Sequence, residues 1–253
     1  ESFFARVDRE SKGRMYVGIH ASALTSQTNA QIRVFSSLLQ GVRSVDGRTE
    51  KERDPYWSII GYFNSLRELG HTATLVQAEI PEYLNTMWFR KGIRKTEEKD
   101  LRRFINNNNV IELTSRKRSS EIPEALQKLE ITSPVKDKKY PVDICLCTNM
   151  ISVGVDIQRL GLMTVIGQPK TTSEYIQATS RVGRSADGPG LVIVIYHTAK
   201  PRDRSYYEHF YAYHGSIYSN IEPTSVTPFS SPVRERALHA LLVALARYLG
   251  TDD

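Results

Sequence analysis

Short, uninterrupted apolar segments recur along this chain, separated by polar turns or by stretches with helical periodicity. An uninterrupted apolar segment of this length is typical of a strand that is buried on both faces. Strands that alternate with helices favour a parallel sheet with helices on both sides, so the sequence predicts an α/β fold. The expected strands are 15–20, 57–63, 72–76, 110–113, 142–147, 163–166 and 191–196.

Helices are expected where a polar capping residue precedes apolar residues at helical spacing. Glycine is the expected stop, because it tolerates the left-handed backbone that commonly ends a helix. The predicted helices follow Ser26 and end at Gly41, follow Ser65 and end at Gly70, cover 122–129 and 172–181, and begin near Ser231 and end at Gly250.

Length and composition limit how the chain is organised. Of its 253 residues, 40% are hydrophobic and 25% are charged, a globular composition that allows a substantial core. No segment approaches the roughly 18 consecutive apolar residues that a membrane span needs, and the chain opens without an initiator Met, like an excised fragment. The two cysteines are too few for a disulfide framework, so we expect a protein of the reducing cytoplasm without a membrane partner. Three parts are expected: a strand and helix in 1–54, a central unit in 55–200 and a mostly helical extension in 201–253.

Residue types that commonly bind metals show no ligand pattern. Cys145 and Cys147 are two residues apart on one predicted strand, so they share a face and are expected to pack in the core. The scattered histidines, including His209 and His214, are interpreted as structural. We therefore predict no metal site.

Positive charge is concentrated between the apolar segments. The 34 Lys and Arg residues against 28 Asp and Glu residues leave a formal charge of +6. Such a balance suits a polyanionic partner such as nucleic acid, although a solvated enzyme surface is the alternative. The basic residues gather in 90–103, in 116–118 and at Lys136, Lys138 and Lys139.

A doubly cationic pattern follows the strand predicted at 163–166. At about 100° per residue, Gln177, Arg181 and Arg184 project from one face of a helix. Two arginines three residues apart repel each other unless an anion lies between them, and planar guanidinium groups suit phosphate oxygens. The pattern therefore predicts a phosphate site, and a solvated basic helix end is the alternative.

A second pattern, Thr-x5-Gly-Val-Asp, begins at Thr148 and ends at Asp156 after the strand predicted at 142–147. Ligands of open α/β sheets bind beyond the carboxyl ends of the strands, so polar residues at this place are candidate ligand contacts. The alternative for Thr148 and Asn149 is an ordinary turn, and Asp156 can cap a local turn.

Asn64 and Ser65 stand in the same position after the strand predicted at 57–63. They are candidates for hydrogen bonds to a ligand at the carboxyl edge of the sheet. They suit a helix N-cap equally well, because their short polar side chains can accept a hydrogen bond from the first turn.

These segments resemble the C-terminal RecA-like lobe of superfamily 2 helicases and translocases. Residues 148–156 are similar to motif V, 177–184 to motif VI and 62–67 to motif IV, although Ser180 stands where many members have Gly. The resemblance is tightest to the large helicase of bacterial DISARM-type phage-defence systems. It implies a RecA-like parallel sheet sandwiched by helices. The supporting phrases are 61–70, 112–116, 148–184 and 222–229.

The resemblance also implies a role for each motif residue. Arg181 and Arg184 would contact the γ-phosphate of ATP, with Arg184 as the arginine finger, and Gln177 would orient phosphate or the attacking water. Asp156 would bind the ribose or couple the two sites, and the Gly154 backbone would let the loop approach closely. The residues expected to hydrogen-bond nucleic-acid phosphates are Thr148, Asn149, Asn64 and Ser65.

The sequence contains neither Gly-x4-Gly-Lys-[Ser/Thr] nor an Asp-Glu-x-[His/Asp] box. ATP and Mg²⁺ are therefore expected to be held mainly by another RecA-like lobe, N-terminal to Glu1. The resemblance implies the motor lobe of an ATP-dependent helicase on nucleic acid, DNA rather than RNA, with that lobe and further defence subunits as partners. The isolated chain is expected not to hydrolyse ATP. A non-catalytic nucleic-acid-binding or scaffold module is the alternative, and the missing P-loop disfavours a stand-alone nucleotide-binding enzyme.

The 201–253 extension is rich in tyrosine. Exposed tyrosines can stack on nucleic-acid bases, whereas a cluster of them more often forms an interface or a core. Both interpretations stay open for Tyr206, Tyr207, Tyr211, Tyr213 and Tyr218.

Overall fold

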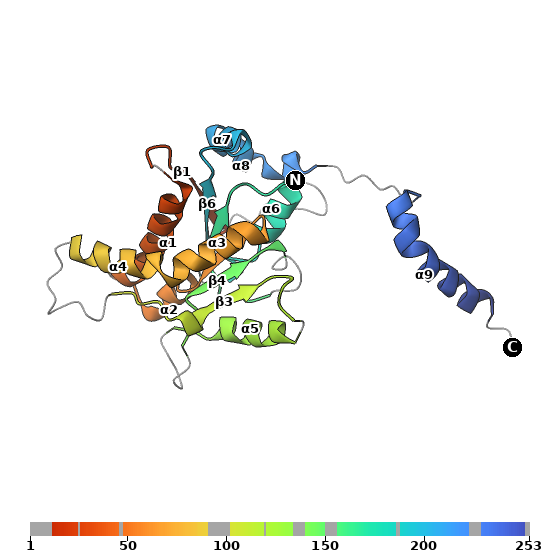
Figure 1. The fold of residues 1–253 in the computed structure, drawn as a ribbon, viewed down its shortest axis with the longest axis horizontal. Helices are drawn as coiled ribbons and strands as arrows, with labels where there is room; N and C mark the ends of the chain where they lie inside the picture. Colours follow the sequence, from red (N-terminus) through yellow and green to blue (C-terminus); the bar gives the residue numbers. More distant parts are fainter. Residues whose placement is uncertain are drawn as a thin grey trace. The chain divides into compact units, whose positions relative to one another are not determined.

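A computed structural model describes residues 12–24, 26–45, 48–90, 102–118, 120–133, 140–149, 156–185, 188–222 and 229–250. The chain separates into two compact units, Glu1–Asn220 and Ile221–Asp253. The first unit contains a six-stranded parallel sheet with the order β1-β6-β5-β2-β4-β3 (Figure 1). Its strands are β1 (Arg14–His20), β2 (Ile59–Phe63), β3 (Val110–Leu113), β4 (Ile144–Cys147), β5 (Leu162–Ile166) and β6 (Gly190–Tyr196).

Helices cover both faces of this sheet, which confirms the predicted parallel α/β sandwich (Figure 1). One face packs against α1 (Gln27–Ser44), α3 (Leu66–Gln77) and α4 (Glu79–Arg90). The other packs against α5 (Glu121–Glu130), α6 (Thr172–Thr179), α7 (Pro201–Glu208) and α8 (Phe210–Gly215). The described residues of the unit also form four short elements: α2 (Glu50–Arg53), η1 (Asp54–Tyr56), η2 (Asn107–Asn109) and η4 (Ile217–Asn220).

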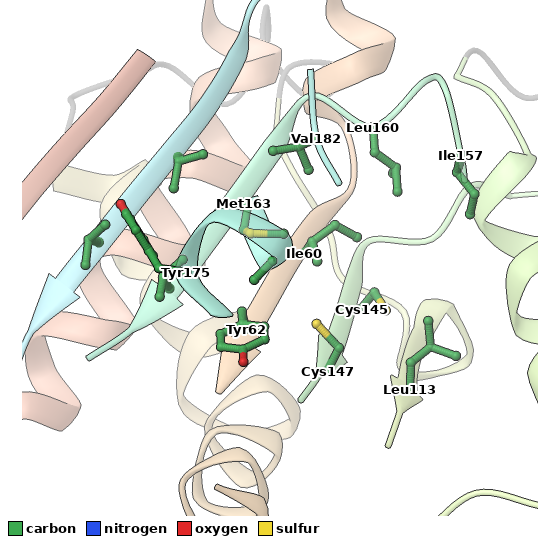
Figure 2. Close-up of a cluster of buried hydrophobic side chains, with 14 of the residues drawn as sticks. Ile60, Tyr62, Leu113, Cys145, Cys147, Ile157, Leu160, Met163, Tyr175 and Val182 are labelled. Carbon is green, nitrogen blue, oxygen red and sulfur yellow. The ribbon is translucent and has the colours of Figure 1, made fainter. Parts of the chain in front are cut away.

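Side chains of each strand alternate between two hydrophobic cores. In β4, Ile144 and Leu146 face α1 and α3, whereas Cys145 and Cys147 face α5 and α6. Figure 2 shows both cysteines beside Leu113 of the neighbouring strand. Burial raises the pKa of both thiols, so they behave as small apolar side chains, as their spacing predicted.

The strand predicted at 72–76 is wrong, because these residues form the second half of α3. Leu69, Thr72 and Val76 are buried at helical spacing against the sheet. Gly70 lies inside the helix instead of ending it. A glycine costs a helix about 1 kcal/mol, whereas burying one large apolar side chain stabilises by roughly 1.5–3 kcal/mol. Packing therefore outweighs the local propensity of this segment.

Other predicted boundaries also shift. Helix α1 continues past Gly41 to Ser44, whose hydroxyl donates to the carbonyl of Gln40 at 3.0 Å. Helix α6 ends at Thr179, so the segment that follows it does not project from a helix face as the 172–181 prediction assumed. Two strands begin two residues later than predicted, at Ile59 and at Ile144.

A buried ion pair lies at the amino-terminal edge of the sheet, directly before β4. Arg103 Nη2 lies 2.6 Å from Asp143 Oδ1, and the two side chains are 2% and 5% exposed. The guanidinium also lies over the ring of Trp57, 3.4 Å from its centroid. Burial lowers the pKa of Arg103 to about 10, and it raises the pKa of Asp143. Each charge therefore depends on its partner to remain ionised in the core.

Arg103 belongs to the basic residues at 90–103, which the sequence predicts to attract nucleic acid. Its burial in an ion pair removes it from that group, because a side chain enclosed by protein cannot reach a phosphate. Residues 91–101 of the segment lie outside the described residues.

The second unit contains α9 (Ser231–Leu249), which has Pro232 in its first turn and ends at Gly250 as predicted. Among the helices of the described ranges, none combines the length and the apolar character that a membrane crossing requires.

We expect Arg103→Met to lower the free energy of unfolding by about 3–5 kcal/mol, because it leaves the Asp143 charge buried without its partner. Urea unfolding followed by circular dichroism measures this loss. Arg103→Met with Asp143→Asn should recover much of it, since neither charge is then buried. Arg48→Ala, which breaks the exposed Arg48–Glu52 pair, should cost at most about 1 kcal/mol. Equal losses for Arg48→Ala and Arg103→Met would contradict the role of burial.

Candidate functional site

Arg181 and Arg184, the arginines of the predicted motif VI, lie on a tight turn after α6. The chain reverses at Gly183, whose φ of 67° is in the left-handed region, and its amide donates to the carbonyl of Leu160 at 2.8 Å. Val182 points into the hydrophobic core beside Leu160 (Figure 2). Val182 is buried, whereas Arg181 and Arg184 on the same turn are half-buried.

A contact between two glycines places this turn at the amino ends of the strands. A Cβ atom added to Gly183 would lie 2.4 Å from both Cα and N of Gly190, the first residue of β6. No side chain fits there. Gly190 pairs with Arg14 at the start of β1, so the turn lies beside the amino ends of β1 and β6. The predicted phosphate site is therefore not at the carboxyl edge of the sheet.

Asp156, from the predicted motif V, lies against the same turn. Arg184 Nη1 donates to Asp156 Oδ1 at 2.5 Å, and Arg184 Nε donates to the carbonyl of Ser180 at 2.9 Å. Burial lowers the pKa of Arg181, the charge of Arg184 lowers it further, and Asp156 opposes both. Two guanidinium groups and one carboxylate thus share one small surface.

Gln177 lies on the exposed side of α6, shortly before this turn. Its carbonyl accepts a hydrogen bond from the Ser180 hydroxyl at 2.9 Å. Gly154 lies outside the described residues, as do the other residues of 150–155. The structure therefore describes the predicted motif V segment at its two ends only.

The predicted nucleic-acid contacts lie at the carboxyl edge, at the other end of the strands. Asn64 follows β2, and its Nδ2 donates to the carbonyls of Ile166 at 2.9 Å and Gly167 at 3.1 Å. The Asn64 amide therefore ties β2 to the loop after β5. Ser65 is the N-cap of α3, because its hydroxyl accepts from the amide of Glu68 at 3.2 Å. Ser65 remains exposed to solvent, whereas Asn64 is partly buried.

Thr148 and Asn149 follow β4 at the same edge. Thr148 is 7% exposed, and its amide donates to the carbonyl of Leu113 at 3.4 Å. Asn149 is exposed. Thr148 therefore continues the edge of the sheet, and Asn149 presents its side chain to the surface.

A polar network that we did not predict holds the loops of this edge together. Glu68 lies 3.5 Å from His197 Nε2 and accepts from Lys200 Nζ at 2.9 Å. The buried carboxylate of Asp203 accepts from the amides of His197 at 2.8 Å and Gln168 at 3.3 Å. The sequence signal for His197 is its position directly after the strand predicted at 191–196, where residues reach the carboxyl edge of the sheet. The contacts themselves join residues that are far apart in the sequence.

Among the described residues, no three His, Cys, Asp or Glu side chains come together as metal ligands would. The arginine turn offers cationic donors, which fit the phosphate groups of a nucleotide rather than a metal ion.

Glu68 should stabilise the chain in a pH-dependent way. Its contacts with His197 and Lys200 lower its pKa to about 2, from an unfolded value of about 4.3. The stabilisation is therefore present above about pH 4.3 and is lost as the pH falls toward 2. We expect Glu68→Gln to lower the free energy of unfolding at pH 7 by about 1 kcal/mol, allowing for solvent screening.

Thermal unfolding of the wild type and Glu68→Gln between pH 7 and pH 3 measures this effect. The two melting temperatures should converge as the pH falls below about 4. Glu124→Gln is the matched control, since Glu124 also pairs with a lysine at 2.8 Å but is far more exposed. A constant difference between wild type and Glu68→Gln at every pH would contradict the assignment.

We expect Gly183→Ala to destabilise the chain by about 2–4 kcal/mol, because the new methyl group meets Gly190 and the backbone is left-handed. Gly41→Ala should instead stabilise by about 0.5–1 kcal/mol, since Gly41 lies inside α1 with open space around it. Urea unfolding measures both changes. Similar effects of the two substitutions would show that the contact with Gly190 is not limiting.

Comparisons with known proteins show that this chain is similar to helicases. Residues 72–186 match the model of the helicase conserved C-terminal domain. The chain is 43% identical over 251 residues to the DISARM protein DrmA of Bacillus paralicheniformis (strain ATCC 9945a / NCIMB 11709 / CD-2). This match covers 98% of the chain and 21% of that protein, so the chain spans about a fifth of the length of its curated relative.

Two solved structures share the fold. The DUF1998 helicase MrfA bound to DNA has a TM-score of 0.57 at 15% identity, covering 86% of this chain and 25% of its own. The Mycobacterium smegmatis helicase Lhr bound to ssDNA and AMP-PNP has a TM-score of 0.55 at 13% identity. This match covers 93% of this chain and 25% of the Lhr chain. The RecA-like fold is thereby established. The family match, the DISARM relative and the shared fold confirm that this chain resembles the C-terminal RecA-like lobe of helicases.

Proposed function

We propose that this chain is the C-terminal motor lobe of an ATP-dependent helicase or translocase that acts in defence against phage. The observation that carries the proposal is the surface shared by Arg181, Arg184 and Asp156. Two adjacent guanidinium groups repel each other, and an anion between them relieves that repulsion. Nucleotide phosphates are anions of the required geometry.

In this proposal the arginine turn faces a second RecA-like lobe, N-terminal to this chain, that holds most of the nucleotide and its Mg²⁺. ATP, when bound between the lobes, supplies the γ-phosphoryl group that is transferred to water. Arg184 acts as the arginine finger and exchanges Asp156 for phosphate oxygens. Arg181 provides the second cation, and Gln177 orients phosphate or the attacking water. An arginine finger accelerates phosphoryl transfer by about 10³–10⁵.

Asp156 gains a second role from its position. It terminates the segment that begins at Thr148, so one stretch of chain runs from the carboxyl edge of the sheet to the arginine turn. When Arg184 leaves Asp156 for the nucleotide, the chain from Thr148 to Asp156 would therefore couple nucleotide binding to the carboxyl edge. The Gly154 backbone belongs to the same stretch and would let it approach the ligand closely.

Nucleic acid is proposed to bind along the carboxyl edge, DNA in preference to RNA. The bound DNA in the MrfA and Lhr structures supports this choice of partner. Asn149 and Ser65 are exposed and would hydrogen-bond phosphate oxygens directly. Thr148 and Asn64 would hold the strand ends that present them. Other subunits of a defence system are further proposed partners, in the cytoplasm.

In the full-length protein, Arg184→Ala should lower the rate of DNA-stimulated ATP hydrolysis at least about 10³-fold. The affinity for single-stranded DNA should stay within about twofold, since the arginine turn and the carboxyl edge are separate places. Steady-state kinetics and a fluorescence binding assay measure the two quantities. Arg33→Ala, which removes an exposed arginine of α1, is the control and should change neither. Undiminished hydrolysis by Arg184→Ala would favour the non-catalytic scaffold instead.

The chain by itself should not hydrolyse ATP, because its sequence lacks a P-loop. Phosphate release from the purified chain, with and without single-stranded DNA, measures this. Turnover that disappears in the Arg184→Ala variant would contradict the proposed division of labour between the lobes.

A further inference from the structure

Arg14, the first residue of β1, is bonded to the turn that carries the motif arginines. Its Nε donates to the carbonyl of Val182 at 2.8 Å, and its Nη2 donates to the carbonyl of Ser180 at 3.2 Å. Both carbonyls lie beyond Thr179, where the hydrogen-bond ladder of α6 has ended. Arg14 therefore satisfies backbone groups that the helix itself leaves open.

These two hydrogen bonds flank Arg181 along the chain. The carbonyls of Ser180 and Val182 stand on either side of that residue, so holding both of them restrains the backbone from which its side chain projects. The carbonyl of Ser180 also accepts from Arg184 Nε at 2.9 Å. Arg14 and Arg184 thus converge on one acceptor, and Arg14 lies in contact with the backbone around both motif arginines.

The side chain of Arg14 reaches the turn because Gly190, its partner in the sheet, has no side chain. A Cβ at Gly190 would lie 3.0 Å from Arg14 Cγ, 3.1 Å from Gly183 Cα and 3.2 Å from the carbonyl oxygen of Val182. The amide of Gly190 donates to Gly13 at 2.9 Å, which holds β1 in register at this point. The missing side chains of Gly183 and Gly190 therefore leave room for the Arg14 guanidinium to reach the turn.

We propose that Arg14 is the positioning residue of the arginine turn. Its guanidinium holds the peptide groups of Ser180 and Val182 so that Arg181 and Arg184 keep the geometry in which they act on phosphate. This inference rests on the proposed function and adds a residue to it. An arginine is required because two separate carbonyls need a forked donor, whereas the single ammonium of lysine reaches one of them well.

The test uses the full-length protein with single-stranded DNA at saturation. Arg14→Ala should lower kcat for ATP hydrolysis by about 10–100-fold, because displaced Arg181 and Arg184 side chains stabilise the transition state less well. KM for ATP should stay within about threefold. Arg14→Lys should fall between the wild type and Arg14→Ala. The double variant Arg14→Ala with Arg184→Ala should hydrolyse ATP less than about twofold more slowly than Arg184→Ala alone. Both substitutions remove the same contribution to catalysis, so their effects should not add.

A second measurement, without nucleotide, follows amide hydrogen exchange of the same variants. Arg14→Ala should accelerate exchange in 180–185, including the Gly183 amide, and leave 162–166 and 190–196 unchanged. The matched control is Arg53→Ala, because Arg53 also donates to a backbone carbonyl, that of Val45 at 2.7 Å, and should change neither exchange in 180–185 nor kcat. Arg14→Lys keeps the charge and the packing of β1, so it remains informative if Arg14→Ala does not fold.

Three results would overturn the proposal: wild-type kcat in Arg14→Ala, multiplied losses in the double variant, or exchange that rises across the whole sheet. Multiplied losses would show that Arg14 acts independently of Arg184, and exchange that rises across the whole sheet would show that Arg14 only stabilises the fold. Full activity of Arg184→Ala would instead refute the proposed function, and the exchange measurement would still decide whether Arg14 holds the turn.

Discussion

The approach of Gly183 to Gly190 is the contact on which the rest of the candidate site depends. It brings the turn after α6 onto the amino ends of β6 and β1, at a distance that no side chain permits. The turn is then closed by the hydrogen bond to Leu160 and anchored by the buried Val182. These contacts hold the backbone that carries Arg181 and Arg184 beyond the end of α6.

Much of this fold is predictable because parallel strands are buried on both faces, which leaves continuous apolar segments in the sequence. Six of the seven expected strands are present. The exception, 72–76, combines β-branched and apolar residues in a way that suits a strand locally. Its helical conformation follows from tertiary burial of one face, which local propensity does not contain.

The candidate site is likewise predictable from the sequence only where its residues form a local pattern. Gln177, Arg181 and Arg184 are candidates in the sequence because their spacing is local, and Asp156 because it ends a strand-associated motif. Their expected arrangement on one helix face was wrong, since α6 ends at Thr179. Arg14 left no sequence signal, because its partners are 166 and 168 residues away and are backbone atoms. Contacts of that kind depend on the register between β1 and β6.

The pairing of β1 with β6 sets the smallest part of the chain that can form the complete sheet. The family match covers 72–186 and so includes only β3, β4 and β5 of the six strands. Within it β4 and β5 have no contact through hydrogen bonds except by way of β2, which lies outside the match. A fragment cut at the family boundaries would lack the strand that joins its own two halves, together with Arg14 of β1, which is hydrogen-bonded to the arginine turn. The smallest unit that preserves the site therefore extends from β1 through β6.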